Sequence, residues 1–199
     1  TMPNGEGILG RPISTQGALI VQKPGSNNLY YVFTISPENY QVGLHYSIVD
    51  INLDGGLGDV TSQKNIFVNN TLDAIEKLIA VRHTNNKDIW IIVRKFTEDS
   101  YAAFLLTENG LETEPVISPT IDRDFLVEGA KGTMKVSFDK KYLVAAYWLD
   151  GGGMFNRNVC FDINKFNAKT GQIEFMYRLN KNTNINPNYE PMAVEFSPD

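Results

Sequence analysis

Cysteine is almost absent from this chain of 199 residues, in which Cys160 is the only one. A single thiol excludes an intrachain disulfide framework and a metal cage built from thiolates. Because Cys160 lies in the apolar run Val159 to Phe161, we expect a buried core thiol. A reactive cysteine would need a histidine and an acid nearby, and the neighbouring sequence does not supply this pair.

Long apolar runs and clustered positive charge are also scarce. The longest apolar stretches, such as Tyr142 to Leu149, reach about eight residues, against the roughly 20 that span a bilayer. We expect no membrane-spanning segment, and we expect any export signal to lie outside this sequence. The net charge is -5 and the 18 basic residues are scattered. Binding of nucleic acid through its phosphates is therefore disfavoured.

Helical periodicity is missing too, and a repeat of strands takes its place. Leu72 to Ala80 is the nearest candidate for a helical turn. Three segments, at 17–70, 74–128 and 131–186, recur at a spacing of about 58 residues and share one order of strands and turns, and a fourth copy begins at 190–199. The repeat predicts a single all-β domain with four strands in each unit. The expected strands are Ala18 to Gln22, Leu29 to Ser36, Leu44 to Leu53, Gly58 to Val68, Lys77 to Arg82, Ile89 to Thr97, Tyr101 to Thr107, Glu114 to Ser118, Met134 to Phe138, Leu143 to Leu149, Asn158 to Asn167 and Gln172 to Leu179.

The turns between these strands favour an antiparallel meander. Lys23 to Asn28, Thr84 to Asp88 and Asp139 to Lys141 each join a first strand to a second. They are rich in Gly, Pro, Asn, Asp or Lys, and the first four tolerate left-handed or preset backbone angles.

The second strand of each unit is continuously apolar instead of alternating. Leu29 to Phe33, Ile89 to Val93 and Tyr142 to Trp148 show this pattern, which is typical of a strand with both faces covered. Radial packing of four-stranded blades covers both faces, whereas a two-sheet sandwich exposes one face of every strand. We therefore expect an incomplete β-propeller of about three blades, with the sandwich as the alternative.

An ordered series of phrases resembles the WD-like propeller region of secreted and surface proteins of Bacteroidetes. The phrases are Gly7 to Pro12, Gln16 to Val21, Pro24 to Phe33, Tyr46 to Asp50, Gly55 to Val60, Lys77 to His83 and Asp88 to Trp90. The closing Val194 to Asp199 is similar to the phrase that opens a further blade in that family. Such proteins typically end in a gliding-motility-associated, type B sorting domain for type IX secretion. The resemblance implies a secreted or outer-surface location and a display or binding role.

An open arc of blades predicts a partner for its ends. A closed propeller needs at least about four blades, so three blades leave two end faces with exposed apolar surface and strand edges. We expect the remaining blades of a longer polypeptide, or a second copy of the chain, to cover them.

Motifs for metals, cofactors and catalysis are weak. Asp54 to Asp59 carries two carboxylates and three glycines but lacks the ligand spacing of a calcium loop, so we interpret it as a hairpin connection. His45 and His83, the only histidines, have no second ligand at zinc spacing. We interpret the acidic pairs Glu98-Asp99 and Asp122/Asp124 as solvated loop charge, and we expect no cofactor, metal or catalytic residue.

The loop from Asp150 to Arg157 is the strongest candidate for partner contact. Three glycines precede Met154, Phe155 and Arg157, which are good contact residues. The alternative is a flexible connection with Phe155 packed into the next blade.

Two function classes follow from these patterns. The first is a noncatalytic module that binds or scaffolds a protein or glycan. The second is the propeller part of a hydrolase or lactonase-like enzyme, with its active residues in the channel or in another domain.

Overall fold

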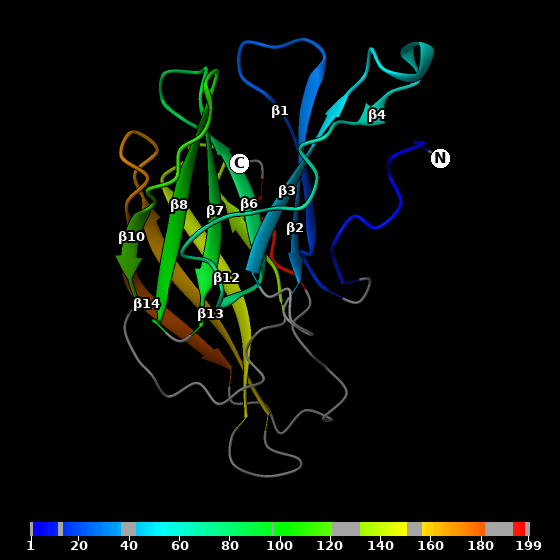
Figure 1. The fold of residues 1–199 in the computed structure, drawn as a ribbon. Coiled ribbons are helices and arrows are strands. Elements are labelled where there is room, and N and C mark those ends of the chain that lie inside the picture. Colours follow the sequence, from blue (N-terminus) through cyan, green and yellow to red (C-terminus); the bar gives the residue numbers. More distant parts are fainter. Residues whose placement is uncertain are drawn as a thin grey trace.

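The computed structural model of the chain describes residues 2–11, 14–36, 43–96, 98–120, 132–150, 157–181 and 193–197. These residues form an all-β structure of three antiparallel sheets, none closed on itself (Figure 1). Within these ranges, the 3-10 turn Asp54–Gly56 is the only helical element. None of the described helical structure is long and apolar enough to cross a bilayer.

The first sheet, sheet A, is a meander that follows the predicted strands closely. It contains β1 (Ala18–Gln22), β2 (Leu29–Ser36), β3 (Gly43–Asp50) and β4 (Asp59–Val60), with β5 (Ile66–Phe67) also paired to β3. The predicted bounds of β1 and β2 are confirmed. The predicted fourth strand is divided into β4 and β5 by its polar middle.

The second sheet, sheet B, replaces the possible helical turn with a strand. It contains β6 (Ala74–Arg82), β7 (Ile89–Lys95), β8 (Ser100–Thr107) and β10 (Val116–Pro119), with β9 (Gly110–Leu111) also paired to β8. The helical alternative for Leu72 to Ala80 is wrong, because β6 occupies that stretch. Its pairing with β7 shifts between Ala74 and Leu78, which places Glu76 and Lys77 in a bulge.

The third sheet, sheet C, has the longest strands. It contains β11 (Met134–Val136), β12 (Tyr142–Asp150), β13 (Arg157–Phe166) and β14 (Ile173–Lys181), in that order. The β13–β14 turn packs closely on sheet B. A Cβ atom on Gly171, which has φ of +76°, would lie 2.8 Å from the Trp90 ring, so a larger residue would displace the indole.

Sheet B lies between the other two sheets. Alternate residues of β7 point to opposite faces: Ile91 and Val93 belong to a core shared with sheet A, and Trp90 and Ile92 to a core shared with sheet C. The sheet A side of the first core includes Val21, Tyr31, Phe33, Ile35, Leu44, Ile48 and Val68, and the sheet C side of the second includes Met134, Leu143, Ala145, Tyr147, Cys160, Phe166 and Ile173. The prediction that an unbroken apolar second strand is covered on both faces is confirmed for β7.

The first strands of the three sheets lie side by side. β6 contacts both β1 and β11, and each of the three pairs with only one other strand in the part of the chain described. Residues before β1 cross this row and are called the N-terminal clip: Arg11, Thr15 and Gln16. Thr15 N donates to Glu76 Oε2 at 2.9 Å, and the Gln16 amide both donates to Met134 O (3.0 Å) and accepts from Met134 N (2.7 Å). The clip thus connects sheet A to sheet C across the start of β6.

Candidate functional site

The predicted contact loop lies mostly outside the described residues. Met154 and Phe155 belong to the undescribed stretch 151–156. Arg157 is the first residue of β13, and its backbone pairs with Asp150 of β12. The contact role of these three residues stays a prediction.

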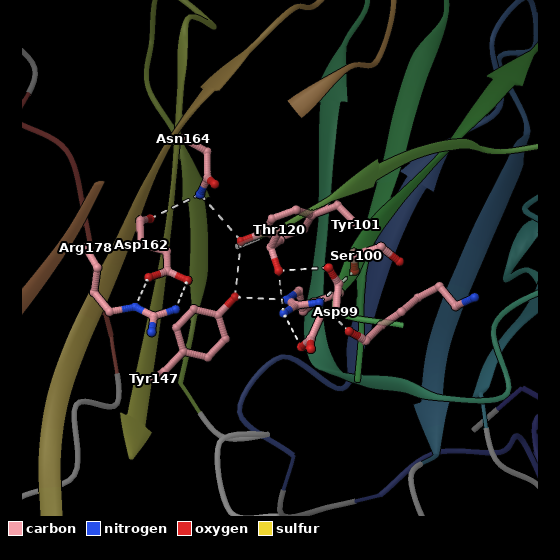
Figure 2. A network of polar contacts seen from close by, with 10 residues as sticks. Asp99, Ser100, Tyr101, Thr120, Tyr147, Asp162, Asn164 and Arg178 are labelled. Atoms are coloured by element: carbon pink, nitrogen blue, oxygen red, sulfur yellow. Dashed lines mark hydrogen bonds and ion pairs between the residues drawn. The ribbon is translucent and has the colours of Figure 1, made fainter. Parts of the chain in front are cut away.

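The most unusual feature of the described residues is a polar network buried between sheets B and C (Figure 2). Arg94 continues the row of Trp90 and Ile92 on β7, so its guanidinium points toward sheet C. Its Nε donates to Tyr147 Oη at 3.3 Å, and its Nη2 donates to Thr120 Oγ1 at 3.0 Å and Asp99 Oδ1 at 3.2 Å. Its Nη1 donates to the carbonyls of Ser100 (3.0 Å) and Lys95. One cation therefore fixes the end of β7, the turn after it and a tyrosine of the next sheet.

The sheet C side of the network is an ion pair joined to two tyrosines. Arg178 of β14 donates to both carboxylate oxygens of Asp162, at 2.6 and 3.0 Å. The hydroxyls of Tyr101 and Tyr147 lie 3.1 Å apart, and Asn164 Nδ2 lies 3.5 Å from Tyr101 Oη. Burial raises the pKa of both tyrosines, so they remain neutral hydrogen-bonding groups at neutral pH.

Lys77 adds a third cation to this region. The β6 bulge turns its fully buried side chain toward sheet C, where Nζ lies 4.4 Å from the centroid of the Tyr147 ring. Burial, followed by the positive charge of Arg94, lowers the pKa of Lys77 to about 7, against the opposing influence of Glu76, Cys160 and Asp162. An amine of this kind changes its charge near neutral pH.

The network combines an amine, carboxylates, tyrosines and a thiol, but it is enclosed. Lys77, Tyr101 and Asn164 are 0% exposed, and Asp162 is 1% exposed. Cys160 is buried as predicted, and burial raises the pKa of its thiol to about 12, which keeps it protonated. A substrate could reach these groups only if sheets B and C separated. The arrangement suits a structural contact better than a reaction site.

Sequence reasoning missed this network and misread one of its members. Asp99 was expected to be solvated loop charge, but its carboxylate is largely buried beside Arg94. Glu98 fits the expectation better, since it is mostly exposed, although it pairs with Lys95. Asp122 and Asp124 lie outside the described residues. One signal was available: the adjacent basic residues Arg94 and Lys95 follow directly on the apolar run Ile89 to Val93.

The weak metal motifs form no cluster in the described ranges. No group of three His, Cys, Asp or Glu side chains that could hold a metal ion occurs there. His45 is buried, which lowers its pKa, and its ring packs on Phe67. The His83 ring lies against Trp90, and its Nε2 is 2.9 Å from Lys169 O. Asp54–Gly56 is a turn between β3 and β4, as the hairpin interpretation predicted.

Several openings lie on the described surface, and two of them are lined more by apolar than by polar groups. The larger, of about 1230 Å³, lies where the hairpin turns of sheet C meet sheet B, and Lys141, Lys165 and Glu174 are among the residues around it. The smaller, of about 510 Å³, runs along β1, β6 and β11 and is called the inner groove. Both volumes lie near the range of ligand sites, roughly 300–1,000 Å³.

A comparison with models of protein families, a search of characterised proteins and a search of solved structures each found no match.

Proposed function

We propose that this chain is a noncatalytic module that binds or scaffolds a protein or glycan. In this proposal it is part of a β-propeller in a larger protein that is secreted or displayed on the outer cell surface of a bacterium of the Bacteroidetes, through type IX secretion. One observation carries the proposal: sheet B is covered on both faces by neighbouring antiparallel sheets, with β1, β6 and β11 side by side. Radial stacking with first strands innermost is the arrangement of propeller blades.

Exposed apolar side chains on the outer sheets support the contact with further blades or a second copy. Ile20 of β1 points away from sheet B and is 69% exposed. Tyr177 and Leu179 of β14 flank the inward-pointing Arg178, and both are about half exposed. Apolar side chains in these positions are suited to packing against another sheet.

The binding role is favoured over the hydrolase alternative by the burial of the reactive groups. The amine, carboxylate and thiol of the network are closed off between sheets B and C, whereas the inner groove is open and lined mainly by apolar residues. An open apolar groove with a few polar groups is typical of a ligand site.

Two measurements on the purified chain test the proposal. Arrays of glycans and of cell-surface proteins should reveal saturable binding, while fluorogenic ester, lactone, glycoside and peptide substrates should show no turnover. Turnover that is lost in an Asp162→Asn variant would contradict the proposal and favour the enzyme. On intact cells that make the full-length protein, external protease should digest this region; protection until lysis would contradict the surface location.

A further inference from the structure

The inner groove carries an inference about the class of partner. Its floor is β6, from Leu78 to Arg82, and its walls are residues of β1 and of β11 with the turn that follows. The apolar residues that line it are Ala18, Leu19, Leu78, Ile79, Ala80, Val81, Val136 and Phe138. Phe138 is 75% exposed, although it is a large aromatic residue at the mouth of an apolar groove. Such a side chain gains contact when a ligand enters.

One end of the groove is closed by the N-terminal clip. Thr15 and Gln16 line the groove and bind the starts of β6 and β11 through Glu76 and Met134. The opposite end is the mouth, because Arg82 is the last residue of β6 and Lys140 belongs to the turn after β11. A ligand therefore enters between Arg82, Phe138 and Lys140.

The charge of the groove is opposite to that of the whole chain. The charged residues that line it are Arg82, Lys135 and Lys140, and none of the described lining residues is acidic. Lys135 already pairs with Glu195 at 2.8 Å. Arg82 donates to the carbonyl of Asn86 and keeps its positive charge. In a chain with net charge -5, two cations at the mouth of an apolar groove select an anionic group next to an apolar one.

The backbone favours a peptide over other anions. β1, β6 and β11 each pair with one strand among the described residues, so the backbone N–H and C=O groups along the other edge of each are not paired with a strand there. An extended peptide can satisfy such groups, as it does when it adds to a sheet edge. The groove volume suits a segment of about three to five residues.

We propose that the inner groove binds an extended peptide whose apolar residues lie against β6 and whose acidic residue is held at the mouth by Arg82 and Lys140. This inference rests on the proposed binding role and names the partner of that role. The proposed binding of the peptide is noncovalent.

The test uses fluorescence anisotropy with the full chain and a fluorescein-labelled peptide, Leu-Val-Leu-Asp-Asp. We expect saturable binding that weakens by about tenfold or more for the Leu-Val-Leu-Asn-Asn analogue and for an Arg82→Gln, Lys140→Gln double variant. Phe138→Ser, a change at an exposed residue, should weaken binding several-fold without loss of fold. Lys141→Gln is the matched control, because Lys141 is exposed and pairs with Asp139 outside the groove; its affinity should be that of the wild type.

Three results would overturn the inference. These are no saturable binding up to about 1 mM peptide, equal affinity for the Asp and Asn peptides, or wild-type affinity in the double variant. Displacement of the peptide by decanoate at lower concentration than by unlabelled peptide would assign the groove to a fatty anion instead. If the arrays detect a partner that the peptide does not displace, the binding role stands and only the groove assignment fails.

Discussion

The two contacts made by sheet B differ in chemistry although they are made by the same strands. Toward sheet A, β7 and β8 present Ile91, Val93 and Phe104 to an almost entirely apolar core. Toward sheet C, the same strands present Arg94 and Tyr101 beside their apolar residues. The burial of apolar side chains stabilises the fold but does not require one particular alignment of the two sheets. Buried charges must give up their hydration, which costs free energy, and they are tolerated only when their partners are in place. The contact between sheets A and B (the A–B contact) therefore contributes mainly stability. The contact between sheets B and C (the B–C contact) also fixes how sheet C is aligned on sheet B.

The B–C contact also leaves one buried polar atom unsatisfied. Asn164 Oδ1 is buried at the B–C contact without a hydrogen-bond partner among the described residues. Each such atom costs about 1–3 kcal/mol. The following changes separate the two contacts.

The largest effect is expected at the A–B contact. Phe104→Ala removes a fully buried ring from the core with sheet A and should lower the free energy of unfolding by about 3–5 kcal/mol in urea titrations. Phe138→Ala is the control, because Phe138 is exposed, and it should change stability by less than about 0.5 kcal/mol. Similar losses for both variants would show that sheet A does not cover sheet B in solution.

The next effect is expected from the central cation of the B–C contact. Arg94→Met keeps the apolar stem but leaves Asp99, Thr120 and Tyr147 without their donor, and should cost about 3 kcal/mol. Arg82→Met, at an exposed arginine, should be close to neutral in the same thermal and urea unfolding experiments. A loss below about 1 kcal/mol for Arg94→Met would mean that the network is solvated.

A third prediction uses the pH dependence of Lys77. The pKa of Lys77 is about 7 in the folded chain and 10.5 for an unperturbed lysine, so between these values the unfolded chain binds one more proton. Stability from this residue therefore rises with pH through this window, and the buried charge destabilises the fold most below about pH 7. Lys77→Met should be more stable than the wild type, and its advantage should shrink by about 2 kcal/mol between pH 6.5 and 8.5. Parallel pH profiles for the two proteins would contradict the lowered pKa.

The smallest effect is expected from one hydroxyl. Tyr147→Phe leaves the ring under Lys77 but removes the oxygen that joins Arg94 to Tyr101, and should cost about 1 kcal/mol. Tyr177→Phe is the matched control, because that side chain is half exposed. If the two variants have the same free energy of unfolding, the hydrogen bonds of the Tyr147 hydroxyl contribute no stability beyond that of the packed ring.

The strands were predictable because their pattern is local. The bounds of β1 and β2 follow from apolar runs and turn residues that lie next to one another in the chain. The covering of β7 on both faces was also predictable, since Ile89 to Val93 has no polar face to offer to water. The early start of β6 at Ala74 was not, because the bulge at Glu76 and Lys77 breaks the alternation that identifies a strand.

The polar network could not be predicted from the sequence in the same way. Arg94 and Tyr147 are 53 residues apart, and Tyr101 and Asn164 are 63 apart. Each is a single polar residue on a strand, and its partner is set by how two sheets lie on each other. The sequence contains no signal for that offset, so Asp99 looked like an ordinary loop carboxylate.

The N-terminal clip has a consequence for how the chain folds and unfolds. Each sheet is a meander that can form from neighbouring residues, and stacked repeats of that kind commonly open from their ends. Gln16 and Met134, however, are 118 residues apart and meet only when all three sheets are in place. The clip therefore makes the first and third sheets depend on each other, and the Met134 amide should exchange with solvent only when the whole stack opens. The apolar cores join each outer sheet to sheet B, and the two hydrogen bonds of this one glutamine side chain add a direct link between the outer sheets.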